Sequence, residues 1–256
     1  MPFRLEPQRT QSTKNNHRMA DYSFQQTPST RATDCENPRA RTMTEIIPAI
    51  DVKTRHEFVQ NLKKIHTKKV HVDVMDGVFV QNTTVPIAEI KNIKNTVKYI
   101  IHLMVADDQP FVDELLTWKN VDTIIIHPEG KKNLLPLIHI IKHKKKVGLA
   151  LKPKTSVQRI TPYLSLLDEV LVMTVEPGMP GQAMTKSPLR KIAQLTNVTV
   201  SVDGGINTKT APIAARAGAD VLYATSAVFG EKSPKQALRR LREAVSQDLY
   251  EDPKAH

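Results

Sequence analysis

Residues 70–77 read Val-His-Val-Asp-Val-Met-Asp-Gly, and this stretch decides the fold. Its valines alternate with His71, Asp73 and Met75, and a period of two predicts a β-strand. Side chains alternate across a strand, so these three residues share one face. The closing Asp-Gly pair predicts a turn. A histidine and an aspartate two positions apart near the end of a strand can reach one metal ion, and a hydrogen-bonded core pair is the alternative.

The alternation of strand and helix continues along the chain. The expected strands are residues 46–50, 69–75, 97–104, 121–127, 146–151, 169–175, 198–202 and 221–224. The expected helices are residues 55–66, 86–93, 111–118, 133–143, 156–163, 187–195, 208–217 and 234–246. Strands that alternate with helices are parallel, and eight such units favour a closed (β/α)8 TIM barrel over an open doubly wound sheet. No GxGxxG follows the first strand, which counts against a dinucleotide-binding fold.

Composition and length describe one large α/β domain, which we assign to residues 43–256. There is no run of about 18 apolar residues, so no transmembrane helix is expected. The sole cysteine, Cys35, excludes an intrachain disulfide and favours a reducing compartment, so we expect a cytoplasmic protein.

Residues 1–42 differ from the rest, being rich in Thr, Gln, Asn, Pro and Arg without apolar periodicity. Such a segment buries too little surface to offset its ordering entropy, so we predict a disordered extension. It lacks the apolar core of a secretory signal, and its prolines and four acids argue against a transit peptide. Translation from Met19 or Met43 would omit part or all of it.

The net charge of +11 suits a phosphorylated substrate, nucleic acid or an anionic membrane. The densest basic run is 142–146, Lys-His-Lys-Lys-Lys, for which a solvated helix end is the alternative. Because the chain has no helix-turn-helix or aromatic-interleaved basic motif, the sequence argues against nucleic acid as a partner.

Active sites of (β/α)8 barrels lie at the carboxyl ends of the strands. Those ends carry His71 and Asp73 on the second strand, His102 on the third and Asp203 on the seventh. Two histidines and two aspartates from three strands can converge on one divalent metal ion. The seventh strand lies across the barrel from the second, so the two carboxylates would flank a substrate at the mouth.

Two carboxylates on opposite sides of one carbon can remove a proton from one face and return one to the other. The result is inversion at a carbon next to a carbonyl, with the metal stabilising the enediolate. Asp73 and Asp203 are the predicted acid–base pair. Met75, Met104 and Met173 end three strands and either cover the enediolate or belong to ordinary core packing.

Barrels of this kind often bind phosphate at the loops after strands seven and eight. Here these loops carry Gly204-Gly205 and Thr225-Ser226. Glycine allows backbone N–H groups to approach an anion, although a glycine pair alone also fits a tight turn. The loop at 177–182, with Gly178, Gly181 and Gln182, is expected to form a third wall of the substrate site.

Taken together, these motifs resemble the ribulose-phosphate 3-epimerase family. The likeness covers about residues 45–245 and is carried by HVDVMDG at 71–77, with Phe79, Val80 and Asn82, followed by HLM at 102–104, VM at 172–173, Pro177-Gly178, Gly181-Gln182 and VDGG at 202–205. It implies a (β/α)8 barrel of the ribulose-phosphate-binding type, one divalent metal ion (Zn, Fe or Mn) and a homo-oligomer. It also implies interconversion of D-ribulose 5-phosphate and D-xylulose 5-phosphate in the pentose phosphate pathway. By position, His71, Asp73, His102 and Asp203 match the family's metal ligands.

Five positions depart from the usual family pattern. They are Ala49 in place of Ser, Gln81 in place of Pro, Lys152 in place of Asn, Pro180 in place of Gly and Thr225 in place of Gly. The threonine, together with the run 127–129 (His-Pro-Glu), is more like the allulose-6-phosphate 3-epimerase branch, so a hexulose phosphate is the alternative substrate. If the protein is not an enzyme, the alternative is a non-catalytic barrel that binds a sugar phosphate.

Overall fold

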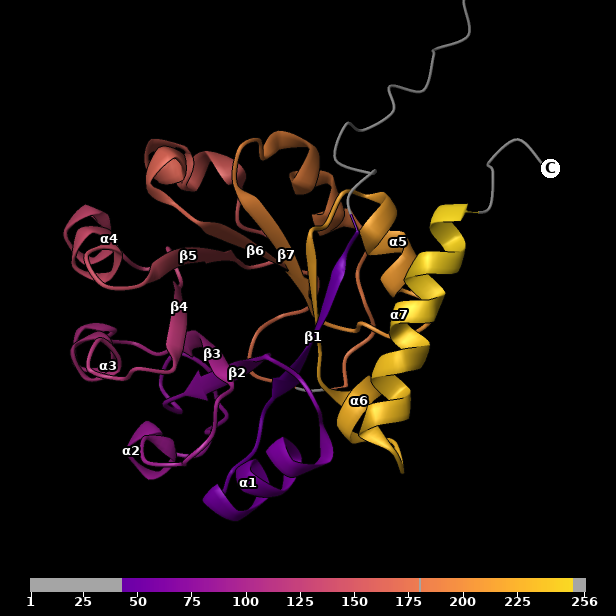
Figure 1. Ribbon diagram of the computed structural model, residues 1–256. Coiled ribbons are helices and arrows are strands. Elements are labelled where there is room, and N and C mark those ends of the chain that lie inside the picture. The colour runs from indigo at the N-terminus through magenta and orange to yellow at the C-terminus, as the bar shows by residue number, and fades with distance from the viewer. Residues whose placement is uncertain (1–42, 180, 251–256) are drawn as a thin grey trace, which may run out of the picture. The chain divides into compact units, whose positions relative to one another are not determined.

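The computed structural model describes residues 43–179 and 181–250, so the predicted extension at residues 1–42 lies outside the described part of the chain. Eight parallel strands close into one barrel in their sequence order, with helices around the outside (Figure 1). The strands are β1 (Glu45–Ile50), β2 (Lys69–Met75), β3 (Lys98–Met104), β4 (Val121–Ile126), β5 (Lys146–Leu151), β6 (Glu169–Met173), β7 (Thr199–Asp203) and β8 (Val221–Ala224). The predicted (β/α)8 barrel is confirmed.

Helices cover every outer face of the barrel. They are α1 (Arg55–Lys64), α2 (Ile87–Ile90), α3 (Gln109–Leu115), α4 (Leu135–Lys142), α5 (Ala211–Arg216), α6 (Ser226–Phe229) and α7 (Pro234–Tyr250), with 3₁₀ helices η1 (Val157–Arg159), η2 (Thr161–Leu166) and η3 (Ser187–Gln194). None of the helices in the described ranges combines the length and apolar character needed to cross a membrane.

Two of the expected helices, residues 156–163 and 187–195, are 3₁₀ rather than α, and each is short. Proline stands near the start of η2 and η3, where its missing N–H and fixed φ suit a helix beginning. The short α6 was not predicted, because four residues directly after a strand leave no helical periodicity to detect. This helix begins at the mouth of the barrel, so it bears on the site.

Local sequence fixes where the first helix starts. Thr54 accepts a hydrogen bond from the N–H of Glu57, and the Glu57 carboxylate accepts one from the N–H of Thr54. This reciprocal cap satisfies two donors that the first helical turn would otherwise leave free. The aromatic ring of Phe58 is then buried against Tyr99 in the layer between barrel and helices.

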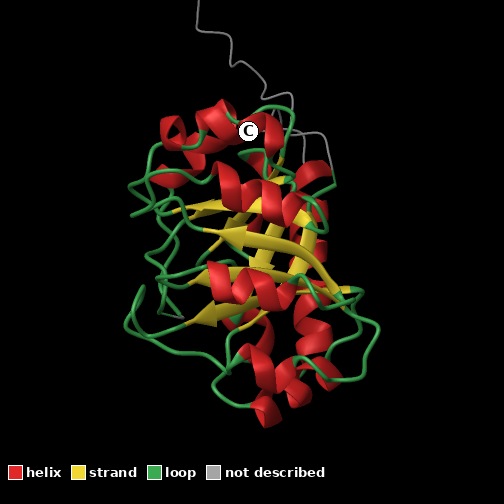
Figure 2. Cartoon of the chain, turned by 90° about the vertical axis from the view of Figure 1, so that its left-hand side faces the viewer, coloured by secondary structure: helices red, strands yellow, loops and turns green. Residues whose placement is uncertain are grey.

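Period-two alternation sorts the strand residues between two hydrophobic layers. The outward-facing residues, such as Val70, Val72 and Val74, pack under the helices in the larger cluster. The inward-facing residues form a separate cluster inside the barrel: Ile47, Ala49, Ile100, Ile125, Ala150, Leu171, Met173 and Tyr223. The barrel interior is therefore packed up to its carboxyl end, where Figure 2 shows the arrowheads of the strands.

The basic run at 142–146 spans the end of α4 and the start of β5, at the opposite end of the barrel from the arrowheads. Lys142 pairs with Asp168, and Lys146 pairs with Asp122. Lys145 donates to the backbone carbonyls of Trp118 and Val121 at 2.5 and 2.8 Å. These contacts fit the expected solvated helix end, with the lysines binding carbonyls and neighbouring carboxylates.

Candidate active site

Four side chains from three strands converge at the carboxyl end of the barrel. His71 and Asp73 come from β2, His102 from β3 and Asp203 from β7. Each offers one ligand atom, and these atoms all lie within 4.8 Å of one another. The structure therefore brings together all four predicted metal ligands, although β2 and β7 are not neighbours in the barrel.

Asp73 is held by the two histidines. Its Oδ1 lies 3.2 Å from His71 Nε2 and 3.0 Å from His102 Nδ1. Burial alone would raise the pKa of Asp73, but the two imidazoles outweigh it and hold this pKa below its ordinary value. His71 in turn stacks on Tyr223 with the ring centroids 3.9 Å apart. Asp73 is therefore the carboxylate that stays ionised.

Asp203 has the opposite electrostatics. Burial and the neighbouring charge of Asp73 raise the pKa of Asp203 to about 6. Two carboxylates whose pKa values are pushed apart suit opposite roles in proton transfer, one accepting and one donating.

Asp51 is a third carboxylate at the mouth, and the sequence-based prediction missed it. It follows directly after β1, and burial together with the charges of Asp73 and Asp203 raises its pKa to about 6. The signal was available, because an ionisable residue at the end of a barrel strand is the pattern that identified the other site residues.

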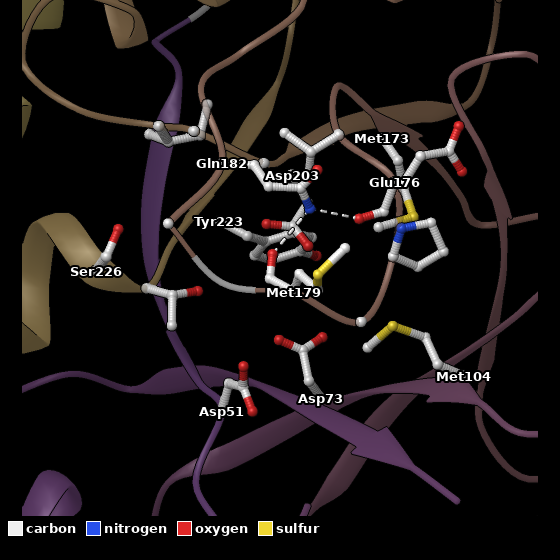
Figure 3. Close-up of a pocket in the computed structure, with 18 of the residues that line it drawn as sticks. Asp51, Asp73, Met104, Met173, Glu176, Met179, Gln182, Asp203, Tyr223 and Ser226 are labelled. Atoms are coloured by element: carbon white, nitrogen blue, oxygen red, sulfur yellow. Dashed lines mark hydrogen bonds between the residues drawn. The ribbon is translucent and has the colours of Figure 1, made fainter. Parts of the chain in front are cut away.

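These groups open into one hollow of about 540 Å³, part of it open to solvent (Figure 3). The predicted substrate-site residues all line it: Met75, Met104, Met173, Gly178, Gly181, Gln182, Gly204, Gly205, Thr225 and Ser226. Pro177 and Met179, from the loop predicted as a wall, also line it, and lining residues outside the prediction are Asp51, Val175, Glu176, Ile206 and Tyr223.

Gln182 lines the hollow but uses its side chain within its own loop. Its Nε2 donates to the backbone carbonyls of Glu176 and Met179 at 2.7 and 2.9 Å (Figure 3). The carboxamide therefore braces the loop after β6. The methionines divide between two settings, since Met75 and Met104 pack with Val80 above the barrel, whereas Met173 belongs to the interior cluster.

Gly204 and Gly205 require glycine for their backbone shape. Their φ angles are +107° and +62°, in the left-handed region that other residues rarely adopt. A Cβ on Gly205 would lie 2.4 Å from the backbone N of Met184, and one on Gly204 would lie 2.6 Å from Val175. The first turn of α6 begins with Ser226, with one residue between it and the end of β8, beside the same hollow. Both loops thus contribute residues to the wall of the hollow.

A second set of polar side chains lies beside His102, at the carboxyl end of β4. His102 Nε2 lies 2.9 Å from His127 Nε2, and His127 Nδ1 lies 2.9 Å from Glu129 Oε2. Burial is the main cause that lowers the pKa of His127 to about 4. Although burial opposes it, contact with His127 and Thr155 lowers the pKa of Glu129 to about 2. The imidazole is therefore neutral and the carboxylate ionised near neutral pH.

The donor set fits a divalent metal ion. Two imidazoles and two carboxylates are borderline and hard ligands of the kinds that Zn²⁺, Fe²⁺ and Mn²⁺ accept. His71 and His102 are fully buried, and His71 Nδ1 finds no hydrogen-bond partner among the described residues. Oδ1 of Asp73 meets two ring nitrogens at once, an arrangement that a shared positive charge stabilises.

Comparisons with known proteins identify the family of this chain. The model of the ribulose-phosphate 3 epimerase family matches residues 43–229. The chain is 40% identical over 193 residues to ribulose-phosphate 3-epimerase of Methanocaldococcus jannaschii, covering 71% of this chain and 81% of that protein. It is 37% identical over 205 residues to the enzyme of the same name in Schizosaccharomyces pombe, covering 76% and 90%. Among solved structures, 3-hexulose-6-phosphate synthase of Salmonella typhimurium matches with a TM-score of 0.63 at 18% identity, covering 80% of this chain and 100% of that one, which shows the fold alone.

Proposed function

This chain belongs to the ribulose-phosphate 3-epimerase family, and we propose that it interconverts D-ribulose 5-phosphate and D-xylulose 5-phosphate by proton transfer at C3. One observation carries the proposal: carboxylates from β2 and β7 meet two histidines within 4.8 Å at the floor of one hollow. Inversion of a carbon needs a proton acceptor on one side and a donor on the other, and these carboxylates come from opposite sides of the barrel.

Asp73 and Asp203 divide the acid and base roles. Ionised Asp73 takes the C3 proton from one face, and Asp203, whose pKa is raised to about 6, gives a proton to the other face. The electron pair of the broken C–H bond moves toward the adjacent carbonyl and returns to form the new C–H bond. Each turnover leaves Asp73 protonated and Asp203 ionised, which equals the starting state for the reverse reaction; exchange with solvent resets it.

One divalent metal ion (Zn²⁺, Fe²⁺ or Mn²⁺) completes the site. His71, Asp73, His102 and Asp203 would hold it. When bound, it polarises the substrate carbonyl and stabilises negative charge on the substrate oxygens. Met75 and Met104, packed with Val80 above the barrel, keep water from the reacting carbon.

The phosphate of the substrate binds at the loops after β7 and β8. The left-handed turn at Gly204-Gly205 and the residues Thr225 and Ser226 line the same hollow as the aspartates. Backbone N–H groups in such turns attract anions without the entropy cost of ordering a long side chain. In this proposal the phosphate lies on the β7–β8 side of the mouth.

The test is an epimerase assay on the purified full-length chain with D-ribulose 5-phosphate. We expect conversion to D-xylulose 5-phosphate, incorporation of one solvent deuterium at C3 in D₂O, loss of activity after chelation, and recovery when the metal is returned. A chain that binds the pentulose phosphate and turns over neither epimer with Zn²⁺, Fe²⁺ or Mn²⁺ supplied is a non-catalytic barrel, and the proposal fails.

A hexulose phosphate is the second candidate substrate. Thr225 lines the hollow and adds a hydroxyl where the family resemblance has glycine. Comparing kcat/KM for ribulose 5-phosphate and allulose 6-phosphate decides between them. We expect the pentulose to be preferred, and Thr225→Gly to increase that preference.

We also propose that the enzyme is a cytoplasmic homo-oligomer. A single cysteine in 256 residues fits a reducing compartment, and a relative in Oryza sativa is named as a cytoplasmic isoform. Light scattering on the purified chain gives the oligomeric state, and a monomer at micromolar concentration would contradict this part of the proposal.

A further inference from the structure

His127 and Glu129 lie behind the proposed metal ligands and have no part in the proton transfer described above. His127 extends β4 at its carboxyl end, is fully buried, and contacts His102 on the side away from Asp73. Four groups thus form one line of contacts: Asp73 Oδ1 to His102 at 3.0 Å, His102 to His127 at 2.9 Å, and His127 to Glu129 at 2.9 Å.

The direction of hydrogen bonding along this line is set at the Glu129 end. Oε1 of Glu129 accepts from the N–H of Lys152 at 3.1 Å and from the hydroxyl of Thr155 at 2.5 Å. An ionised carboxylate offers only acceptors, so Oε2 must also accept, and the ring of His127 carries its proton on Nδ1. A neutral imidazole has one donor and one acceptor, which leaves His127 Nε2 as an acceptor.

Only one tautomer of neutral His102 can donate a hydrogen bond to His127. Nε2 of His102 must donate to His127 Nε2, so the neutral ring of His102 carries its lone pair on Nδ1. That lone pair faces Oδ1 of Asp73 at 3.0 Å, and two acceptors at this distance repel unless a positive charge lies with them. A metal ion bound between the two atoms would supply that charge.

We infer that Glu129 and His127 are positioning residues that hold His102 in the tautomer able to bind a metal ion through Nδ1. The inference rests on the proposed metal-dependent function and adds a role for two residues that touch neither substrate nor metal. Without this support the neutral ring can move its proton to Nδ1, donate to Asp73, and lose its free lone pair on the metal side. Partners of this kind behind a metal-binding histidine typically contribute 10- to 100-fold to metal affinity or activity.

Glu129→Gln is the main variant, because the carboxamide keeps the shape but can donate as well as accept. Glu114→Gln is the matched control, since it removes the same charge from an acid that pairs with Lys91 on the outside of the barrel. On the full-length chain, competition between the protein and a chelator for Zn²⁺ should show about 10- to 100-fold weaker binding for Glu129→Gln and no change for Glu114→Gln.

The second readout is the ring tautomer of His102, seen by ¹⁵N–¹H NMR of the metal-free protein. We expect the proton on Nε2 in the neutral ring of the wild type and on Nδ1, or on both in exchange, in Glu129→Gln. A role in folding alone would lower stability without moving this signal. A wild-type His102 protonated on Nδ1 overturns the inference with no variant needed, as does a Glu129→Gln variant that keeps both the tautomer and the affinity.

Failure of the proposed function gives a different result. In that case the wild-type chain binds no Zn²⁺, Fe²⁺ or Mn²⁺ and converts no ribulose 5-phosphate, while the tautomer of His102 is still read directly. A second variant, His127→Gln, replaces the acceptor of the His102 N–H by a group that can also donate, and we expect the same loss of metal affinity.

Discussion

The two sides of the barrel mouth are built in different ways. On the β2–β4 side, polar side chains contact one another in series, from His71 and Asp73 through His102 and His127 to Glu129. Each member is buried or half-buried and contacts at least one other member of the series. Such a network is costly when it is incomplete and specific when it is satisfied.

On the β7–β8 side, no such series of side-chain contacts starts from Asp203 among the described residues. Asp203 is followed by two glycines with positive φ, and Thr225 and Ser226 line the same hollow. The carboxylate of Asp203 has no imidazole partner comparable to those of Asp73 within the described residues, and its pKa rises to about 6 instead of falling. The comparison shows how one barrel pushes the pKa values of two aspartates apart: one side supplies partners that stabilise the ionised form and the other does not.

Substitution of the aspartate on either side should lower kcat to a similar extent. Asp73→Asn and Asp203→Asn each remove one of the two proton-transfer groups, so we expect kcat to fall about 100- to 10,000-fold in both. Asp122→Asn, a carboxylate paired with Lys146 at the other end of the barrel, serves as the control. A steady-state epimerase assay measures the effect, and near wild-type turnover in either variant would refute the two-carboxylate mechanism.

In the metal-free protein, substitutions on the two sides should change the free energy of unfolding in opposite directions. Asp73→Asn replaces a carboxylate that contacts two buried imidazoles, so we expect a loss of about 1–3 kcal/mol in the free energy of unfolding. Asp203→Asn removes a charge that is unfavourable when ionised, so we expect a gain of about 1–2 kcal/mol at neutral pH, a figure reduced because the side chain keeps some exposure. Urea unfolding after chelation measures both values, and changes of the same sign would contradict the comparison.

The pH dependence of the unfolding free energy gives a further test of the raised pKa of Asp203. With its pKa raised from 3.8 to about 6, Asp203 in the folded protein keeps a proton that the unfolded chain has already lost within this window. Its contribution to stability is therefore present below about pH 4 and declines as the pH rises to about 6. Asp51 contributes with the same sign. We expect Asp203→Asn to flatten the decline in urea-unfolding free energy of the metal-free protein, and an unchanged slope would show that Asp203 does not titrate in this window.

The strands and the ligand set were predictable because both depend on simple periodicities. Alternation of two placed His71, Asp73 and Met75 on one face, and the rule that barrel chemistry lies at strand ends added His102 and Asp203. The 3₁₀ character of η2 and η3 was not predictable, since apolar spacing does not separate 3₁₀ from α over so few residues.

The side-chain contacts between neighbouring strands could not be predicted from the sequence. The sequence shows that His127 and Glu129 follow the fourth strand, but not that this histidine meets His102 at 2.9 Å. That distance depends on the register of β3 against β4, which shifts between Tyr99 and Ile100. Asp51 is a different kind of omission, because it directly follows its predicted strand, as Asp203 does, and the same rule could have included it.

Glycine substitutions give the smallest effect and test the backbone-built side alone. Gly205→Ala needs a left-handed φ of +62° and brings a Cβ within 2.4 Å of the Met184 backbone, so the turn must move. Gly181→Ala is matched, because its φ of +78° carries similar strain while its Cβ meets nothing within 4 Å. Because the turn at 204–205 is proposed to bind the phosphate and not the reacting carbon, we expect Gly205→Ala to raise KM several-fold with a smaller change in kcat, and Gly181→Ala to raise it less. If Gly205→Ala instead lowers kcat and leaves KM unchanged, the phosphate does not bind at this turn, and the division of labour between the two sides is wrong.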